Sequence, residues 1–137
     1  MTCIVVDASI SLAWCFPDKR GPASLVVRER IRSGDRALVP AFWAVEVLNA
    51  VLLGERRGRI TRKESEAFLD DVRTLDPILD YASLEQIAGP IQAICRDHNL
   101  TPYDALYVEL AFRSGFPLAT LDGPQKKSAE AMGVKCL

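Results

Sequence analysis

The chain has 137 residues, of which 49% are hydrophobic and 26% are charged, the proportions of an ordinary globular protein. Seventeen lysines and arginines against eighteen acidic residues leave a net charge of −1. This balance excludes a protein held on nucleic acid by bulk positive charge, so a polyanion must be bound by local patches or through metal ions. We expect one domain covering residues 1–137, long enough to bury a core without cross-links.

The four cysteines, at positions 3, 15, 95 and 136, lie in apolar stretches without C-x-x-C spacing. They indicate reduced, buried thiols and a cytoplasmic location, with two disulfides as the alternative. A zinc site is disfavoured because the chain has one histidine, His98. The N-terminus lacks the pattern of a signal peptide, and no apolar run approaches the ~20 residues of a membrane span.

Short β-rich runs alternate with longer helical patterns along the chain. The apolar run Cys3 to Val6 is typical of a strand buried on both faces, and it precedes a helix, a break at residues 17–22 and a second helix to about Ser33. Strands separated by helices predict a parallel sheet with helices on both faces. Further strands are expected at residues 37–39, 77–79, 118–122 and 134–136, and further helices at 41–57, from 61, from 83, from 101 to Gly115, and after the Gly123-Pro124 turn.

Capping residues mark where three of these helices begin. Thr61 and Ser83 each open a capping box, with Glu64 and Gln86 three residues later. Thr101 is followed by proline, which suits the first position of a helix. Gly89-Pro90 lies inside the helical pattern that begins at Ser83 and is expected to kink or split it.

Three aspartates stand where strands end or helices begin. Asp7 and Asp122 follow predicted strands, and Asp104 lies in the first turn of a predicted helix. Helix capping or a favourable interaction with the helix dipole explains each of them individually. In a parallel sheet, however, ligands bind beyond the carboxyl ends of the strands, so the three side chains are expected at one rim.

Glu46 is harder to explain as a structural residue. It interrupts an almost wholly apolar helical run from Ala41 to Leu53, in which a charge rarely occurs unless it is paired or binds metal. The alternative is a polar stripe along a buried helix. Asn49 is three residues later and lies on the same helix face.

Gathering four carboxylates is electrostatically unfavourable. Two like charges ~4 Å apart repel by about 4 kcal/mol at an effective dielectric constant of 20. No lysine or arginine stands beside these acids in the sequence, so a hard divalent cation is the natural counterion. All-oxygen ligands select Mg²⁺ or Mn²⁺ over zinc, and such ions can clamp a phosphodiester and supply hydroxide.

The sequence resembles PIN-domain proteins, and specifically the VapC toxins of bacterial and archaeal toxin–antitoxin pairs. The resemblance spans essentially the whole chain with order and spacing preserved. The matching residues are Ile4-Val5-Val6-Asp7-Ala8-Ser9, Glu46 with Asn49, Tyr103-Asp104-Ala105-Leu106-Tyr107, and Pro117-Leu118-Ala119-Thr120-Leu121-Asp122.

This resemblance implies an α/β fold of three layers, an α/β/α sandwich with a central parallel sheet, in a homodimer. It also implies a Mg²⁺- or Mn²⁺-dependent endoribonuclease restrained by a cognate VapB-type antitoxin. Asp7, Asp104 and Asp122 match the metal-binding acids, and Glu46 matches the acid that binds metal directly or through water. Ser9, Asn49 and Thr120 match supporting positions, Asn49 less closely than the hydroxyl residues.

Candidate RNA contacts lie in two basic clusters, for which a solvated surface is the alternative. One surrounds Gly58 and the other follows Asp122. Trp14 and Trp43 are expected in the core or the dimer contact, or along a groove that binds the antitoxin. The basic clusters contain Arg56, Arg57, Arg59, Arg62 and Lys63, and Lys126 and Lys127.

Other functions are possible for a chain that begins with a strand ending in aspartate. A haloacid-dehalogenase-type phosphatase requires a second aspartate two residues later, where this chain has Ser9. A receiver domain requires paired acids and a late lysine, and neither is convincing here. A PIN-fold scaffold that binds RNA or a partner without cutting is the principal alternative.

Overall fold

The computed structural model describes residues 2–19 and 21–137. Within them, parallel strands form a four-stranded sheet in the order β3-β2-β1-β4. The two central strands are buried, and Val5 of β1 lies opposite Leu38 on one side and Leu118 on the other. The strands are β1 (Cys3–Val6), β2 (Arg36–Pro40), β3 (Ile78–Asp80) and β4 (Leu118–Ala119).

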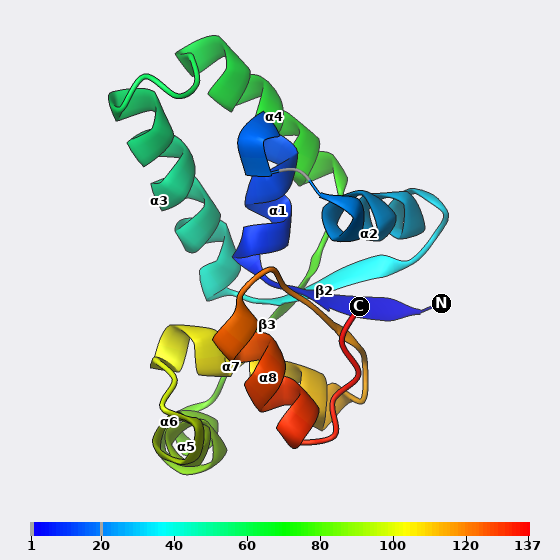
Figure 1. The fold of residues 1–137 in the computed structure, drawn as a ribbon, viewed down its shortest axis with the longest axis vertical. Coiled ribbons are helices and arrows are strands. Elements are labelled where there is room, and N and C mark those ends of the chain that lie inside the picture. Colours follow the sequence, from blue (N-terminus) through cyan, green and yellow to red (C-terminus); the bar gives the residue numbers. More distant parts are fainter. Residues whose placement is uncertain (1, 20) are drawn as a thin grey trace.

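Helices cover both faces of the sheet, as Figure 1 shows. Helices α1 to α4 pack together on one side, and α5 to α8 lie on the other, with α7 against β1 and β2. This is the predicted three-layer α/β/α sandwich. The helices are α1 (Ala8–Cys15), α2 (Pro22–Arg32), α3 (Phe42–Arg56), α4 (Arg62–Thr74), α5 (Leu84–Gln86), α6 (Gln92–His98), α7 (Pro102–Ser114) and α8 (Gly123–Ala131).

The predicted helix starts at Thr61, Ser83 and Thr101 are confirmed, because each side chain accepts a hydrogen bond from the backbone N–H three residues later. The predicted interruption at Gly89-Pro90 takes the form of a π-helical turn, Ile87–Ile91, between α5 and α6. A wider turn accommodates a proline that an α-helix would not. In the break expected at residues 17–22, Pro17–Lys19 forms a 3₁₀ turn, while residue 20 lies outside the described residues.

The last two predicted strands are shorter than expected. Of the predicted strand at residues 118–122, only Leu118 and Ala119 form β4. Of the predicted strand at residues 134–136, only Cys136 pairs with the sheet, through an isolated parallel bridge to Leu118. After Ala119 the backbone leaves the sheet because its polar groups bond to side chains: the Leu121 N–H donates to Ser9 Oγ (2.9 Å). Gly123 and Pro124 begin α8 instead of forming a separate turn.

The strand order reverses at β1. The chain runs from β1 to β2 and β3 on one side, whereas β4 lies on the other side of β1. The Asp7 N–H donates to the Ala119 carbonyl (3.0 Å), so the ends of β1 and β4 remain adjacent. A crevice beyond the carboxyl ends of strands is expected at such a switch in order, and Asp7 and Asp122 stand at it.

Close packing fixes α3 against the segment that contains α1. Trp43 Nε1 donates to Ser11 Oγ (3.2 Å), and both residues are buried. A Cβ atom on Gly54 would lie 2.6 Å from Phe16 Cζ, so glycine is required for this approach. The apolar face of α3 therefore enters the core, and Glu46 is left half-buried at its edge.

The cysteines form no disulfide among the described residues; Cys3 is buried and the other three are half-buried. None of the helices in this part of the chain is long and apolar enough to cross a bilayer.

Candidate metal centre

All four predicted acids line one cavity of about 530 Å³ at the switch point of the sheet. Asp7 stands between β1 and α1, and Asp122 stands between β4 and α8. Glu46 comes from α3 and Asp104 from the first turn of α7. Four segments that are distant in sequence thus place a carboxylate each at one site.

The aspartates stand at helix N-termini, as the capping explanation expects, and they also meet at one rim of the sheet. Asp7 Oδ2 accepts from the Ser9 N–H (3.2 Å) and caps α1, and Asp122 Oδ1 accepts from the Gln125 N–H (2.9 Å) and caps α8. Asp104 is in the first turn of α7, which Thr101 caps. Three helix N-termini therefore meet the cavity, and their dipoles offset part of its negative charge.

Hydroxyl groups fix Asp7, which is only 5% exposed. Thr120 Oγ1 donates to Asp7 Oδ2 (3.1 Å) and accepts from the Asp122 N–H (3.0 Å). Ser9 Oγ lies 3.5 Å from Thr120 Oγ1. Ser9 and Thr120 thus join the ends of β1 and β4 and couple the positions of two of the acids.

Tyr107 holds Glu46, a role that the sequence did not reveal. Its hydroxyl donates to Glu46 Oε1 (2.7 Å), and its side chain is fully buried. The surrounding protein, Glu46 and Asp7 all raise the pKa of Tyr107, so the phenol remains a donor. The sequence offered one signal for this role, the spacing. Tyr107 comes three residues after Asp104 on the same helix, so the two side chains lie on one helix face.

Burial and mutual repulsion raise the pKa values of two of these acids. For Glu46 the largest cause is burial, to which Asp7 and Asp104 add, while the hydrogen bond from Tyr107 acts in the opposite direction. For Asp104 the largest cause is again burial, followed by the charges of Asp122 and Asp7. The four acids therefore interact electrostatically as one group.

Glu109 is a buried acid outside the cavity, and an arginine neutralises its charge. It is 4% exposed, and Arg113 pairs with it (Nε to Oε1, 2.8 Å) while also bonding to Asp80 at the end of β3 (2.7 Å). By contrast, none of the four cavity acids forms an ion pair with any described residue. Their charge is left for a ligand to neutralise.

The donor set suits a hard divalent cation, because every side chain in it is a carboxylate. Its present arrangement is open: no three His, Cys, Asp or Glu side chains in residues 2–19 and 21–137 are arranged to hold a metal ion. Repulsion between uncompensated carboxylates favours such a separation. The acids would have to approach one another to enclose an ion.

Gln125 joins two of the acid-bearing helices and was also missed by the sequence reasoning. It is fully buried; its Nε2 donates to the Asp104 carbonyl (3.0 Å), and its own N–H donates to Asp122. Its Oε1 has no hydrogen-bond partner among the described residues. Gln125 therefore sets the position of α8 relative to the start of α7.

The predicted RNA-contacting residues do not line this cavity. Arg59 bonds to both carboxylate oxygens of Asp18 (3.0 Å each) and lies over the Phe16 ring. Arg62 pairs with Glu66 one turn later. Lys19, which the sequence reasoning overlooked, does line the cavity and brings a positive charge to its rim. Arg56, Arg57, Lys126 and Lys127 are all exposed and lie elsewhere.

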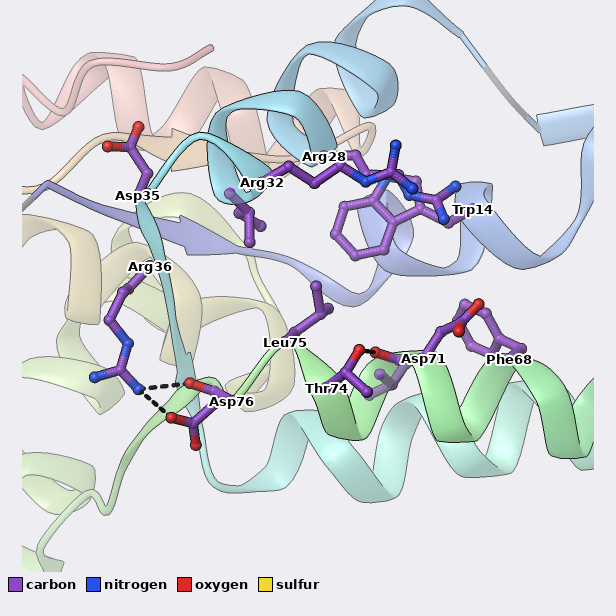
Figure 2. A pocket seen from close by; sticks show the side chains of 13 residues that line it. Trp14, Arg28, Arg32, Asp35, Arg36, Phe68, Asp71, Thr74, Leu75 and Asp76 are labelled. Carbon is purple, nitrogen blue, oxygen red and sulfur yellow. Dashed lines mark hydrogen bonds and ion pairs between the residues drawn. The ribbon is translucent and has the colours of Figure 1, made fainter.

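A second cavity, of about 460 Å³, lies between α2 and α4 and is shown in Figure 2. Trp14 and Phe68 contribute to its apolar wall, and Arg28 and Arg32 reach over it from α2. Arg36, at the first position of β2, closes one end by bonding to Asp76. This cavity is therefore at the amino end of the strands, away from the acids. Trp43, in contrast, is 2% exposed and belongs to the core.

The three-layer fold and the acid-lined cavity at its switch point define the class of protein. The chain belongs to the PIN domain family, whose model matches residues 4–130. It is similar to Ribonuclease VapC3 from Pyrobaculum aerophilum, with 32% identity over 120 residues that cover 87% of this chain and 88% of that protein. It is also similar to Ribonuclease VapC3 from Mycobacterium tuberculosis, with 36% identity over 83 residues, 61% of this chain and 58% of that protein.

Solved structures share the fold at lower identity. A crystal structure of PAE2754 from Pyrobaculum aerophilum matches with a TM-score of 0.71 at 20% identity, covering 98% of this chain and 89% of that one. VapBC2 from Rickettsia felis, bound to a promoter DNA fragment, matches with a TM-score of 0.68 at 11% identity, covering 99% and 98%. The family match and the 32% identity to Ribonuclease VapC3 make the chain a homologue of VapC-type PIN ribonucleases, which are typically metal-dependent.

We expect the stability of the metal-free chain to depend on the raised pKa values. Folding raises the pKa values of Glu46 and Asp104, so the folded state binds these protons more tightly than the unfolded state. Stability without metal should therefore fall as the pH rises from the ordinary carboxyl range through the raised values. At neutral pH, Asp104→Asn should raise the thermal midpoint measured in EDTA.

Mg²⁺ or Mn²⁺ should raise the thermal midpoint of the native chain by roughly 3 to 8 °C at ten times its Kd. Asp104→Asn should remove this shift, whereas Asp97→Asn, an exposed acid on α6, should retain it. An identical midpoint with and without metal, measured by scanning calorimetry, would contradict the assignment of the cavity.

Tyr107→Phe should weaken Mn²⁺ binding by about 10- to 100-fold, the usual effect of losing a group that orients a ligand. The ring volume is retained, so the core should stay packed. Isothermal titration with Mn²⁺ measures the affinity without RNA. Tyr81→Phe, at a 75% exposed tyrosine, is the matched control and should bind as the native chain does. Equal affinities for all three proteins would show that Tyr107 does not position Glu46.

Proposed function

We propose that this chain is a metal-dependent endoribonuclease that hydrolyses RNA phosphodiester bonds, and that Asp7, Glu46, Asp104 and Asp122 hold its Mg²⁺ or Mn²⁺. One observation carries the proposal: four carboxylates without ion-pair partners in the described residues line a single cavity at the switch point. The similarity to Ribonuclease VapC3 supports RNA as the substrate.

The ion, when bound, supplies hydroxide at neutral pH and stabilises negative charge on the phosphate. The chain's own residues prepare the site. Thr120 and the Ser9 N–H hold Asp7 Oδ2, and Tyr107 holds Glu46 Oε1, which leaves Glu46 Oε2 for the ion or a water molecule. Lys19 at the rim offers a positive charge to the RNA backbone.

The proposal includes action as the toxin of a type II toxin–antitoxin pair, restrained by a VapB-type antitoxin. Similarity to VapC3 and to the VapBC2 structure supports this part. The cavity between α2 and α4 is the candidate antitoxin contact, because Trp14 offers an apolar wall there without being part of the acidic cavity. An RNA target places the protein's action in the cytoplasm.

A homodimer is also part of the proposal. Leu48 and Leu52 lie one turn apart on α3, and they are 41% and 37% exposed. Apolar side chains gathered on one helix face are typical of an interface. A second copy of the chain is the partner that the family resemblance implies.

The purified chain should cleave single-stranded RNA in Mg²⁺ or Mn²⁺, and EDTA should abolish cleavage. Asp104→Asn should lower the rate by at least about 100-fold, because it removes a metal ligand. Gel analysis of end-labelled RNA measures the rate, and calorimetry checks that the variant folds. Asp97→Asn should cleave normally.

Cleavage that persists unchanged in Asp104→Asn would mean that the site is wrong or that another nuclease is present. Folded native protein that binds RNA but never cleaves it would favour the scaffold alternative. Sequencing of RNA ends after controlled induction identifies the target.

Expression of the native chain alone should arrest bacterial growth, whereas Asp104→Asn should not. Co-expression of a short DNA-binding protein encoded directly upstream should restore growth, as measured by colony counts. Harmless expression of folded, RNA-cleaving protein would contradict the toxin role while leaving the nuclease proposal intact.

A further inference from the structure

A second hollow, of about 410 Å³, adjoins the acidic cavity. The two share Glu46 and Asp104 as lining residues. The hollow is otherwise lined by neutral side chains, which include Phe42, Asn49 and Tyr103. A nucleotide next to a phosphate at the four acids can therefore reach this hollow.

An aromatic pair forms one wall of the hollow. The rings of Phe42 and Tyr103 are stacked, with centroids 5.0 Å apart and planes 25° apart. Phe42 covers one face of Tyr103, yet Tyr103 is 56% exposed, so its other face is open. An aromatic ring with an open face does not serve the core.

The pair is fixed to the two helices that carry the shared acids. Tyr103 immediately precedes Asp104 in the first turn of α7, and Phe42 lies one turn before Glu46 on α3. The stack therefore spans α3 and α7 beside the acidic cavity. Its position relative to Glu46 and Asp104 is set by the same helix packing that places those acids.

The net charge of the chain does not favour RNA binding at this site. It is −1, and the four acids repel phosphate unless metal is bound. Contacts that do not depend on charge add to the affinity that metal and Lys19 supply. Stacking of a base on an aromatic ring is the usual contact of this kind in proteins that bind single-stranded nucleic acid.

We propose that the hollow is a nucleobase subsite, in which the base of a nucleotide adjoining the scissile phosphate stacks on the open face of Tyr103. The exposed Asn49 amide, which has both a donor and an acceptor, is placed to read an edge of that base. This inference rests on the proposed ribonuclease function and extends it to how the substrate is positioned.

The test compares Tyr103→Ala with native protein on a short single-stranded RNA that contains the mapped cleavage bond. Tyr103→Ala should raise KM by about 5- to 100-fold, the range for loss of one base–aromatic stack, and change kcat much less. Tyr103→Phe keeps the ring and should restore the native KM. Phe112→Ala removes a similarly exposed ring from the same helix (58% exposed) and should leave KM unchanged.

A second set of substrates carries an abasic nucleotide at each position flanking the cleaved bond. At one position the abasic nucleotide should raise the KM of the native enzyme by a similar factor. Tyr103→Ala should then have no further effect on that substrate, because protein and RNA each lose one half of the same contact.

Two results would overturn the subsite while leaving the ribonuclease function intact. One is a native KM for Tyr103→Ala, or an effect of that variant that is equal on every abasic substrate. The other is a change of molecular mass by light scattering in Tyr103→Ala and not in Phe112→Ala, which would assign the hollow to contact between two copies. Failure of the native enzyme to cleave any RNA would overturn both proposals.

Discussion

Repulsion among four carboxylates governs the arrangement of this site. No described arginine or lysine forms an ion pair with any of the four cavity acids. By contrast, Arg113 pairs with the buried Glu109, which lies about one and a half turns after Asp104 on the same helix. Burial and neighbouring charge raise the pKa values of Glu46 and Asp104. The folded chain therefore carries an electrostatic cost at the switch point of its sheet, which the proposed divalent cation would offset. Such a cost is typical of sites selected for function.

The rest of the fold makes this repulsion tolerable without neutralising it. The N-termini of α1, α7 and α8 meet the cavity, and their partial positive charges act on three of the acids. Neutral donors hold individual oxygens: Thr120 for Asp7 and Tyr107 for Glu46. Because these donors carry no net charge, the negative charge of the four acids is left without a counterion. Gln125 adds a buried link between the start of α7 and the start of α8, so that the acids are carried on helices whose relative positions are fixed.

The proposed phosphate-binding and base-binding parts of the site lie in two adjoining hollows. In our proposal, metal and Lys19 bind the phosphate at the acidic cavity, whereas the aromatic pair on α3 and α7 binds a base in the adjoining hollow. A chain with nearly balanced charge can in this way bind a polyanion locally. The cavity between α2 and α4, our proposed antitoxin contact, lies at the opposite end of the strands, where apolar and arginine side chains line it away from the four acids.

The sequence alone predicted strands at residues 3–6, 37–39 and 77–79 from short apolar runs, where the structure has 3–6, 36–40 and 78–80, and it predicted the helix starts at Thr61, Ser83 and Thr101 from local capping. It also singled out the four acids, because three stand where strands end or helices begin and Glu46 interrupts an apolar run. Tertiary packing was needed to establish that Tyr107 is the donor to Glu46, that Gln125 joins α7 to α8 and that Lys19 lines the cavity. It also decided that β4 ends at Ala119, since Ser9 takes the next backbone N–H. Local patterns report on neighbours within a turn or a strand. Tyr107 and Glu46 are 61 residues apart, and their contact depends on how α7 and α3 pack across the end of the sheet.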